Sequence, residues 1–349
     1  MNYVPSVMLG QRYVQIPEFE VKAIGLKAKA YNAFPRGFQK LKGSLIAIYA
    51  SGPAHGNSDR QIWVRSDDEF ETFTSGVFLE NATGVYDLSF LEDLLDPGET
   101  VCFHSIWTIA NEGGVLTTYV NSTVTFTDPY ALWGNPKLID GVWYTTGYRI
   151  AGGYSRTVLV QSTDGMRTWQ FKALSAMNNQ KELSEADIAT CANGNWVQIT
   201  REDSSSTDEL YRTVSTNQGQ TWSAPALLPA HVRGNQPQLI RDPASGALFL
   251  FVGIRKKTSG VTSYGNAVEA WDINGIGCYY SLNDGVTWSS VLMLAPAWAY
   301  ECGQPVPVLL DDGCFGVMFY TSCGAVTVAQ TGVKPGIYFC KFRPDLSAF

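Results

Sequence analysis

Two octets with the same pattern decide how this chain of 349 residues folds: STNQGQTW at 215–222 and SLNDGVTW at 281–288. Both read S-x-N-x-G-x-T-W, and STDGMRTW at 162–169 and SDDEFETF at 66–73 are diverged copies that carry Asp in place of Asn. In each octet we expect the Asp or Asn to hydrogen-bond within its own turn, the Gly to adopt a positive φ, and the Trp to pack between neighbouring sheets. Four copies therefore predict a β-hairpin that is repeated along the chain.

A second repeat runs out of phase with the octets. A glycine that follows a polar or small residue opens a short apolar run: GVWYTTG at Gly141, GNWVQIT at Gly194, GALFLFV at Gly246 and GCFGVMF at Gly313. Such runs, rich in β-branched and aromatic residues, are typical of a buried strand that is entered from a hairpin turn. The four glycines are 53, 52 and 67 residues apart. A period of about 50 residues that is built of strands indicates the blades of a propeller.

The octets resemble the Asp-box, or BNR repeat, S-x-D-x-G-x-T-W of the sialidase (neuraminidase) superfamily. This resemblance implies a six-bladed β-propeller in which each blade is a four-stranded antiparallel sheet. We therefore predict an all-β chain in which residues 31–349 form one six-bladed propeller of sialidase type. Residues 1–30 form an N-terminal segment that contributes a closing strand, and the second of the six blades, residues 80–128, lacks a clear octet.

Composition excludes several classes of protein. The 25 Lys and Arg residues are outnumbered by 32 Asp and Glu, so the formal net charge is −7, a balance poorly suited to binding a nucleic-acid backbone. An apolar fraction of 45% excludes general disorder. No run approaches the ~18 apolar residues of a membrane-spanning helix, so we expect no membrane insertion. The first residues, MNYVPSVMLGQRYVQIPEFE, lack the basic and apolar regions of a secretory signal peptide.

Cysteine and histidine usage predicts neither a metal site nor a cofactor. The seven cysteines are odd in number, form no C-x-x-C pair, and show no zinc-like spacing with the three histidines. Buried free thiols are the simplest interpretation, since a free Cys packs like a small apolar residue.

Propeller topology turns the repeats into a map of the candidate site. The inner strands all run in the same direction, so the start of each first strand and the end of each second strand meet at one rim, which we call the site rim. The octet turns lie at the opposite rim and are structural. Counting strands places ten residues at the site rim: Arg36, Ser51, Asn135, Arg149, Glu185, Arg201, Gln236, Arg255, Gln304 and Thr321.

The arginines at this rim suit an acidic sugar. An arginine presents a planar fork of donors that binds a carboxylate through two hydrogen bonds. The resemblance to sialidases implies an arginine cluster that holds the carboxylate of sialic acid. Arg36 lies in FPRGF, which resembles the first-blade arginine motif of that family. Glu185 and Arg201 match the family's Glu and second Arg, and Arg255 is the candidate for the third.

The segment before the first octet, HGNSDRQIWVRSDD, lies where the family carries its acid/base Asp. His55 is nearest to that position, and Asp59 matches after a small gap. Either side chain could supply general acid/base catalysis. The alternative interpretation is a solvated loop with no catalytic role.

The pattern of exo-acting sialidases is incomplete in this chain. The tyrosine nucleophile of that family is expected where Gln304 stands, Tyr300 lies four residues away, and Thr321 stands where a further Glu is expected. Endosialidases of bacteriophage tail spikes resemble the chain more closely, because they also lack this tyrosine and keep one Glu and two Arg. That reduced set is matched here by Glu185, Arg201 and Arg255, with His55 as a fourth member.

We therefore predict a glycoside hydrolase-like propeller that acts on an acidic, sialic-acid-like cell-surface polysaccharide, as a receptor-binding component of a phage tail. The expected partners are that polysaccharide or a sialoglycan, further copies of the chain in a trimer, and other virion proteins. A virion tail, or an extracellular location reached by a non-Sec route, fits this function, and a cytoplasmic location stays open. We assign His55, Asp59, Glu185, Arg201 and Arg255 to catalysis, and Arg36, Asn135, Arg149, Gln236, Tyr300, Glu301 and Gln304 to substrate binding.

Three alternatives stay open at this point. The first is a non-catalytic, glycan-binding propeller that uses the same rim. The second is a propeller lyase or arabinan-type hydrolase whose acid/base work is done by carboxylates such as Glu185, Asp187 and Glu301. The third is a scaffold propeller without a ligand.

Overall fold

The structure is a computed structural model of the chain. It describes residues 21–25, 31–53, 60–80, 88–92, 100–104, 109–111, 115–117, 129–149, 155–166, 168–178, 180–203, 208–255, 274–297, 302–321, 336–343 and 346. Within these ranges the chain forms 25 strands joined by turns. None of the described residues forms a helix of the length and apolarity that crossing a membrane requires.

Four sheets contain four antiparallel strands each. Blade I is β2(Tyr31–Leu41), β3(Ser44–Gly52), β4(Arg60–Ser66) and β5(Thr74–Glu80). Blade III is β15(Leu183–Thr190), β16(Trp196–Glu202), β17(Leu210–Ser215) and β18(Ala226–Leu227). Blade IV is β19(Asn235–Arg241), β20(Leu248–Ile254), β21(Asn274–Ser281) and β22(Leu292–Ala297). Blade V is β23(Cys302–Leu309), β24(Phe315–Thr321), β25(Gly336–Phe342) and, paired with β25, the N-terminal strand β1(Val21–Gly25).

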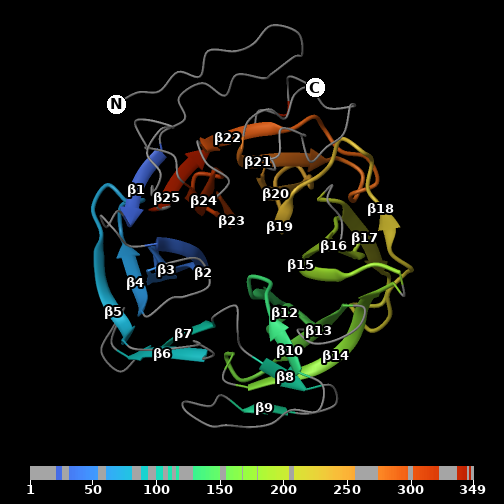
Figure 1. The fold of residues 1–349 in the computed structure, drawn as a ribbon, viewed down its shortest axis with the longest axis horizontal. Helices are drawn as coiled ribbons and strands as arrows, with labels where there is room; N and C mark the ends of the chain where they lie inside the picture. Colours follow the sequence, from blue (N-terminus) through green and yellow to red (C-terminus); the bar gives the residue numbers. More distant parts are fainter. Residues whose placement is uncertain are drawn as a thin grey trace, which may run out of the picture.

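A larger sheet, blade II, has seven strands. It contains β8(Ile109–Asn111), β9(Val115–Thr117), β10(Pro129–Leu132), β11(Lys137–Ile139), β12(Val142–Arg149), β13(Arg156–Ser162) and β14(Thr168–Met177). The remaining strands, β6(Leu88–Glu92) and β7(Thr100–His104), pair only with each other within the described residues. Figure 1 shows this pair between blades I and II, and all the sheets arranged around one central axis.

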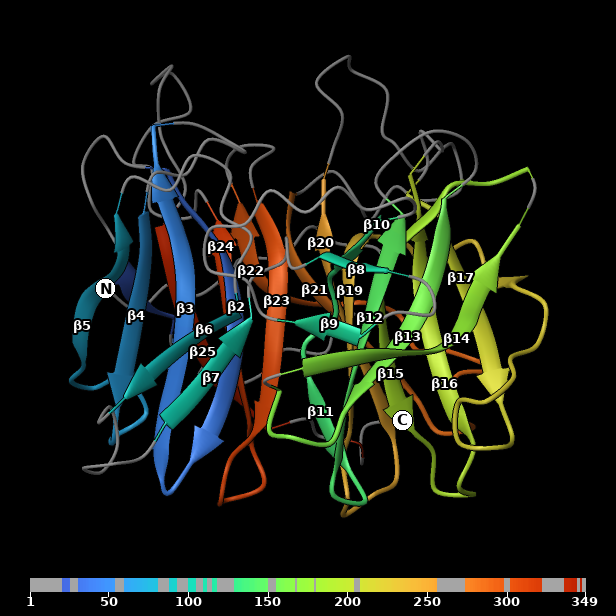
Figure 2. The ribbon, with the colours of Figure 1, turned by 90° about the horizontal axis from the view of Figure 1, so that it is seen from below.

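The predicted all-β propeller of four-stranded antiparallel sheets is confirmed, but the predicted number of blades is not. The described residues form five blade-sized sheets in place of six. Residues 80–128, where the missing sheet was expected, contribute the β6–β7 pair, and their short strands β8 and β9 join the neighbouring blade II. Figure 2 shows the sheets edge-on, with their strands running between the two rims of the propeller.

The octets form one recurring turn, built as their residue types predict. In the octet of blade IV, the Oδ1 of Asn283 accepts from the N–H of Thr287 at 2.8 Å, and the Oγ of Ser281 accepts from the N–H of Gly285 at 2.8 Å. The fifth residue adopts a positive φ in all four copies, 62° at Phe70 and 77° at Gly285. The left-handed backbone therefore belongs to the turn itself, and a non-glycine residue accepts it where packing compensates.

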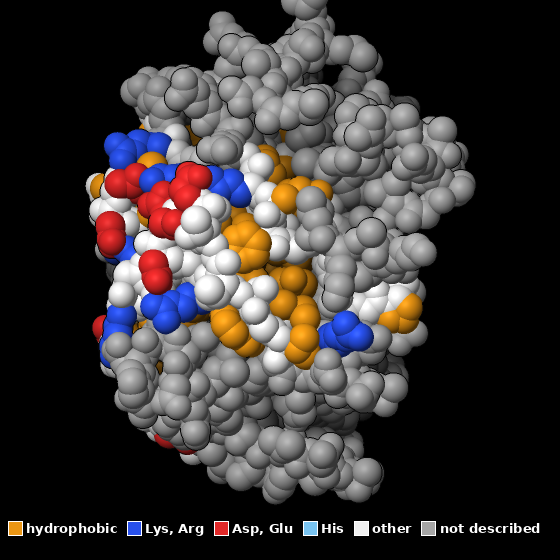
Figure 3. Space-filling view, turned by 90° about the vertical axis from the view of Figure 1, so that its left-hand side faces the viewer, with side chains coloured by type: hydrophobic (Ala, Val, Ile, Leu, Met, Phe, Trp, Pro, Cys, Tyr) orange, Lys and Arg blue, Asp and Glu red, His pale blue; other side chains and the backbone are white. Residues whose placement is uncertain are grey.

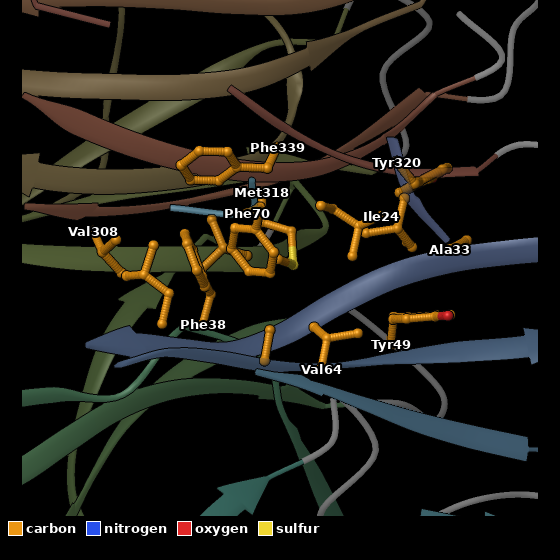
Figure 4. Close-up of a cluster of buried hydrophobic side chains, with 14 of the residues drawn as sticks. Ile24, Ala33, Phe38, Tyr49, Val64, Phe70, Val308, Met318, Tyr320 and Phe339 are labelled. Atoms are coloured by element: carbon orange, nitrogen blue, oxygen red, sulfur yellow. The ribbon is translucent and has the colours of Figure 1, made fainter. Parts of the chain in front are cut away.

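Side chains from neighbouring blades bury an apolar core between them. Figure 4 shows the cluster between blades V and I, where Phe38 and Phe70 of blade I face Phe339 and Met318 of blade V. The ring centroids of Phe70 and Phe339 lie 4.9 Å apart. Similar clusters lie between blades III and IV and between blades IV and V. Contact between blades is therefore mainly hydrophobic on this side of the molecule.

Ion pairs reinforce the join between the first and last blades. Lys22 of β1 reaches Glu71 at 2.5 Å, and Lys341 of β25 reaches Glu69 at 2.6 Å. Within blade V, Lys341 also reaches Asp312 at 2.8 Å. Glu69 and Glu71 belong to the octet of blade I. Figure 3, viewed from the side of β4 and β5, shows acidic and basic side chains lying next to one another on this face. Exposed pairs of this kind add little stability each, so the apolar cluster carries most of the contact.

Hydrogen bonds accompany an apolar cluster at the join between blades II and III. Thr146 and Thr157 of blade II donate to the carbonyls of Ala186 and Leu183 of blade III at 2.5 and 3.1 Å. On the facing side of blade III, Thr200 accepts from the Nε2 of Gln198 at 2.9 Å. The neighbouring hydroxyl of Thr213 is buried and has no hydrogen-bond partner within the described residues.

The octet turn of blade III allows a stability test with a matched control. Gly219 has φ +77°, and a Cβ there would lie 2.6 Å from Leu159 and 3.1 Å from Trp196. Gly313 has nearly the same φ, +78°, and open space around it. We expect Gly313→Ala to cost about 1 kcal/mol for the backbone alone, and Gly219→Ala a further ~1–3 kcal/mol for overpacking. Urea unfolding of the two variants checks this, and equal losses would contradict it.

The join between blades II and III provides a second test. Thr213→Val removes a buried hydroxyl without a partner, so we expect the free energy of unfolding to rise by about 1 kcal/mol. Thr200→Val is the matched control: it removes the acceptor of Gln198, so a loss of about 1–3 kcal/mol is expected. Denaturant titration measures both, and a loss in Thr213→Val as large as that in Thr200→Val would show that the hydroxyl is satisfied in solution.

Candidate functional site

Near the site rim, the inner strands have β-bulges and residues with positive φ, and these irregularities position the residues of the candidate site. The pairing register shifts at Ala33–Arg36 in β2, Leu183–Ala186 in β15, Asn235–Gln238 in β19 and Gly303–Val306 in β23. Phe34, Gln236 and Gln304 have φ of 58°, 55° and 50°, and each precedes a proline. A proline fits a bulge because it has no N–H to give to the ladder. In β15 the residue within the shifted register is Glu185, so the bulges align these positions around the axis.

Glu185 and Arg201 form the central ion pair of the site. The Oε2 of Glu185 lies 2.9 Å from the Nη1 of Arg201 and also accepts from the N–H of Gln236 at 3.1 Å. The second oxygen, Oε1, accepts no hydrogen bond from the described residues. Burial raises the pKa of Glu185, although Arg201 opposes the rise. The carboxyl group is thus fixed by one oxygen and has the other available to a ligand.

Asp203 lies on another edge of the same guanidinium. Its Oδ1 is 3.0 Å from the Nε of Arg201, and its side chain is 31% exposed against 8% for Glu185. The N–H of Asp203 donates to the carbonyl of Glu182 at 2.9 Å, which fixes the chain just after β16. Burial lowers the pKa of Arg201, but Glu185 and Asp203 together raise it above its usual value. Asp203 was not predicted, although its spacing of two from Arg201 is the strand period that puts both side chains on one face.

Arg255 joins blades IV and V at the site rim. Its Nε donates to the carbonyl of Cys302 at 2.8 Å, and its Nη2 donates to the hydroxyl of Tyr320 at 2.5 Å and to the Oε1 of Gln236 at 3.3 Å. The same Gln236 oxygen accepts from the N–H of Gln304 at 2.7 Å. These bonds hold Gln236, Gln304 and Arg255 in one network. Tyr320, next to the Thr321 that replaces the expected Glu, was not predicted.

Arg36 is present at the rim but is almost fully buried, with 2% of its surface exposed. Its Cζ lies 4.1 Å from the centroid of the Trp133 ring, and its Nη1 donates to the Trp133 carbonyl at 2.5 Å. With the amide of Gln304 turned to present its oxygen, that oxygen accepts from the guanidinium. Burial lowers the pKa of Arg36 to about 9. Arg36 therefore supplies positive charge from beneath the surface, since its donors face Trp133 and Gln304.

Tyr148 is a second residue that sequence reasoning missed. Its cross-strand neighbour Thr157 and the residue two before it, Thr146, both donate to carbonyls of β15, so this face of β12 looks toward Glu185. The ring of Tyr148 lies 5.9 Å from that of Trp133 in an edge-on arrangement. Burial raises the pKa of its hydroxyl above the usual value, and the charges of Glu185 and Asp203 add to the rise.

A second charged layer lies deeper along the axis. The Nζ of Lys137 is 2.7 Å from the Oδ2 of Asp187 and donates to the carbonyl of Leu239 at 2.5 Å. The same Asp187 oxygen accepts from the N–H of Leu239 at 2.8 Å. Asp187 has no exposed surface, and burial raises its pKa against the opposing effect of Lys137. Asp187, one of the carboxylates considered for acid/base work, is therefore a structural link between blades.

The structure brings together seven of the twelve predicted site residues: Arg36, Asn135, Glu185, Arg201, Gln236, Arg255 and Gln304. Asn135 donates to the carbonyl of Phe38 at 3.4 Å. Arg149 ends β12, and its backbone pairs with Tyr130. His55, Asp59, Tyr300 and Glu301 lie outside the described residues. Among the described residues no cluster of His, Cys, Asp or Glu could hold a metal ion.

Comparison with known proteins supports the fold at the level of structure. No protein-family model and no curated protein matches the chain. A protein of unknown function from Dyadobacter fermentans matches with a TM-score of 0.64 at 16% identity, over 94% of this chain and all of that one. A Hadza microbial sialidase matches with a TM-score of 0.56 at 16% identity, over 91% and 66% of the two chains. At such identities the similarity shows the propeller fold alone.

Two further structures widen the range of chemistry found on this fold. The phage phi92 endosialidase matches with a TM-score of 0.57 at 11% identity, over 95% of this chain and 70% of that one. A GH43 enzyme from Xanthomonas citri in complex with xylotriose matches with a TM-score of 0.51 at 9% identity, over 94% and 92%. The chain is thus similar to propellers whose names denote activity on glycans, and the function must be argued from its own residues.

The Lys137–Asp187 pair at the axis predicts a loss of stability that depends on pH when Lys137 is replaced. Lys137→Met leaves the buried Asp187 without its cation, so we expect a loss of about 3–5 kcal/mol of stability at pH 7. Asp187 has a raised pKa in the folded state, and loss of Lys137 raises it further, so protonation below that pKa favours folding and restores part of the loss. Urea unfolding at pH 7 and pH 5 measures this. The double variant Lys137→Met/Asp187→Asn is the control, and an equal loss at both pH values in the single variant would contradict the assignment.

Proposed function

We propose that this protein is a glycoside hydrolase that cleaves an acidic, sialic-acid-like cell-surface polysaccharide at the site rim. The observation that carries the proposal is the Glu185–Arg201 pair, in which one carboxylate oxygen is committed and the other accepts no bond from the described residues. A carboxyl group that is buried, has a raised pKa and keeps one oxygen available suits general acid catalysis. The glycan activity in the names of the sialidase and endosialidase neighbours is in keeping with this.

The roles of the other residues follow from their bonds. Arg201 has 21% of its side chain exposed, so its guanidinium is the group that we expect to meet the sugar carboxylate. Arg255 and Gln236 keep the adjacent rim rigid through their bonds to Tyr320 and Gln304. The buried guanidinium of Arg36 contributes a positive electrostatic potential from beneath the surface of the site rim. Such preorganised charge stabilises a transition state without reorganisation during the reaction.

The proposal also includes the more detailed predictions made from the sequence. We take the octets as Asp-boxes and the β6–β7 pair as part of a sixth blade of sialidase type. His55 or Asp59, Arg149, Tyr300 and Glu301 keep their predicted catalytic and binding roles. The proposed setting is a phage tail or another extracellular site, with a trimer of this chain and other virion proteins as partners.

A substrate screen tests the proposed function. Purified protein is incubated with polysialic acid and a panel of acidic bacterial capsules, and chain length is followed by size-exclusion chromatography. We expect at least one polymer to be shortened, and Glu185→Gln to slow cleavage by about 10²–10⁴-fold through loss of the acid. Asp311→Asn is the control, since Asp311 is 91% exposed beside the turn between β23 and β24, on the rim opposite the site.

The outcomes separate the alternatives. Binding without shortening, abolished by Arg201→Ala, would replace the hydrolase with a non-catalytic glycan-binding propeller. Unchanged cleavage or binding in both Arg201→Ala and Glu185→Gln would show that the ligand does not use this rim. The burial of Arg36 and Arg255, whose donors are bonded within the protein, is the observation that favours the non-catalytic alternative.

A further inference from the structure

Arg201 is held between two carboxylates that lie in different environments. Glu185 lies at Nη1 with 8% of its side chain exposed, and Asp203 lies at Nε with 31% exposed. A guanidinium is rigid and planar, so the two distances of 2.9 and 3.0 Å limit the separation of the bonded carboxylate oxygens to about 8 Å. Arg201 therefore sets the spacing of two carboxyl groups, one sheltered and one reached by solvent.

Hydrolysis of a glycosidic bond requires two groups of this kind. One must hold a proton for the leaving oxygen, and the other must be ionised to take a proton from water. Environments that differ in burial separate these two states. The chain therefore carries the elements of a carboxylate pair at a site where the tyrosine expected at Gln304 is absent.

We propose that Asp203 is the second catalytic carboxylate of this site, acting as the general base toward the attacking water while Glu185 acts as the general acid. The inference rests on the proposed function, since it assigns a residue to that reaction. Water forms a C–O bond to the anomeric carbon and gives its proton to Asp203. The glycosidic C–O bond breaks with its electron pair on the leaving oxygen, which takes the proton of Glu185. Proton exchange with solvent restores both carboxyl groups.

Two neighbouring carboxylates, Asp187 and Glu202, do not fit this role. Asp187 has no exposed surface and is held by Lys137. Glu202 is 1% exposed, and its Oε1 accepts from the N–H of Glu182 at 3.2 Å. Asp203 differs because its backbone is fixed at β15 while its side chain reaches solvent next to Arg201.

The position of Tyr148 supports the assignment independently. Its ring lies 5.9 Å from that of Trp133, over which the guanidinium of Arg36 packs. Its face of β12 looks toward Glu185 through the bonds of Thr146 and Thr157 to β15. A phenol on this face can donate a hydrogen bond to a sugar.

Kinetics of Asp203 variants test the proposal on the polymer that the wild-type protein shortens. We expect Asp203→Asn to lower kcat by about 10²–10⁴-fold, with KM changed far less. In the wild type, kcat/KM should fall at acid pH because the base is protonated. This fall should be absent from the pH profile of the Asp203→Asn variant. Formate, a small carboxylate that can occupy the space left by the side chain, should restore activity at least tenfold. Asp203→Glu should retain more activity than Asp203→Asn, and Asp311→Asn should match the wild type.

A second measurement needs no substrate. The side-chain carbon of Glu185 is titrated by ¹³C NMR in the wild type and in Asp203→Asn. Because the negative charge of Asp203 raises the pKa of Glu185, that pKa should fall when the charge is removed. An unchanged Glu185 titration would overturn the pairing.

The outcomes distinguish this inference from the proposed function. If the wild type shortens a polymer and Asp203→Asn does so at a similar rate with the same pH profile, Asp203 is not the base and the hydrolase function stands. A loss of activity without formate rescue and with an unaltered pH profile would reduce Asp203 to a partner that positions Arg201. If the wild type shortens no polymer, the proposed function and the role of Asp203 in it both fall, while the NMR titration still decides whether the two carboxylates are coupled.

Discussion

A buried ion pair at the axis, between Lys137 and Asp187, is the contact on which the arrangement of the inner strands depends. The inner strands belong to separate sheets, so no strand ladder joins one to the next, and side chains must satisfy their polar groups. Lys137 of blade II reaches Asp187 of blade III and the carbonyl of Leu239 in blade IV, while Asp187 accepts from the N–H of Leu239. One pair therefore fixes three blades relative to one another.

Side chains also join the inner strands one layer nearer to the rim, at the candidate site. Strands β15 and β19 are joined at two heights by a carboxylate of the first and a backbone N–H of the second: Asp187 with Leu239, and Glu185 with Gln236. A buried ion pair adds little net stability, because desolvation offsets the attraction. Its structural effect is geometric, since Glu185 is held by one oxygen at a fixed distance from blade IV. The network that orders the blades thus also orients the carboxyl group that we assign to catalysis.

From the sequence we could predict at which rim a residue lies, but not how deeply its side chain is buried. Octets and glycine turns gave the propeller and brought seven predicted residues, among them Glu185 and Arg201, to one region, because strand counting depends only on period and direction. Burial of Arg36 under Trp133 could not be predicted, since it depends on the packing of side chains from blades distant in sequence. Tyr148 was missed for the same reason, whereas Asp203 could have been found from its spacing of two from Arg201. The sixth blade was not confirmed in residues 80–128, where no octet supported it and the described residues form only the β6–β7 pair and two short strands of blade II.

The net charge of −7 and an acidic ligand are compatible because the charges are unevenly placed. Counted over five groups alone, the guanidiniums of Arg36, Arg201 and Arg255 and the carboxylates of Glu185 and Asp203, one positive charge remains. Lys137 and Asp187 cancel in the layer below. Burial makes that single charge effective, since few water molecules screen it and the low dielectric strengthens its field. Protonation of Glu185, as general acid catalysis requires, removes one negative charge and raises the local balance further. Under the proposed function, the protonated state of Glu185 would therefore also be the state that attracts an anionic sugar most strongly.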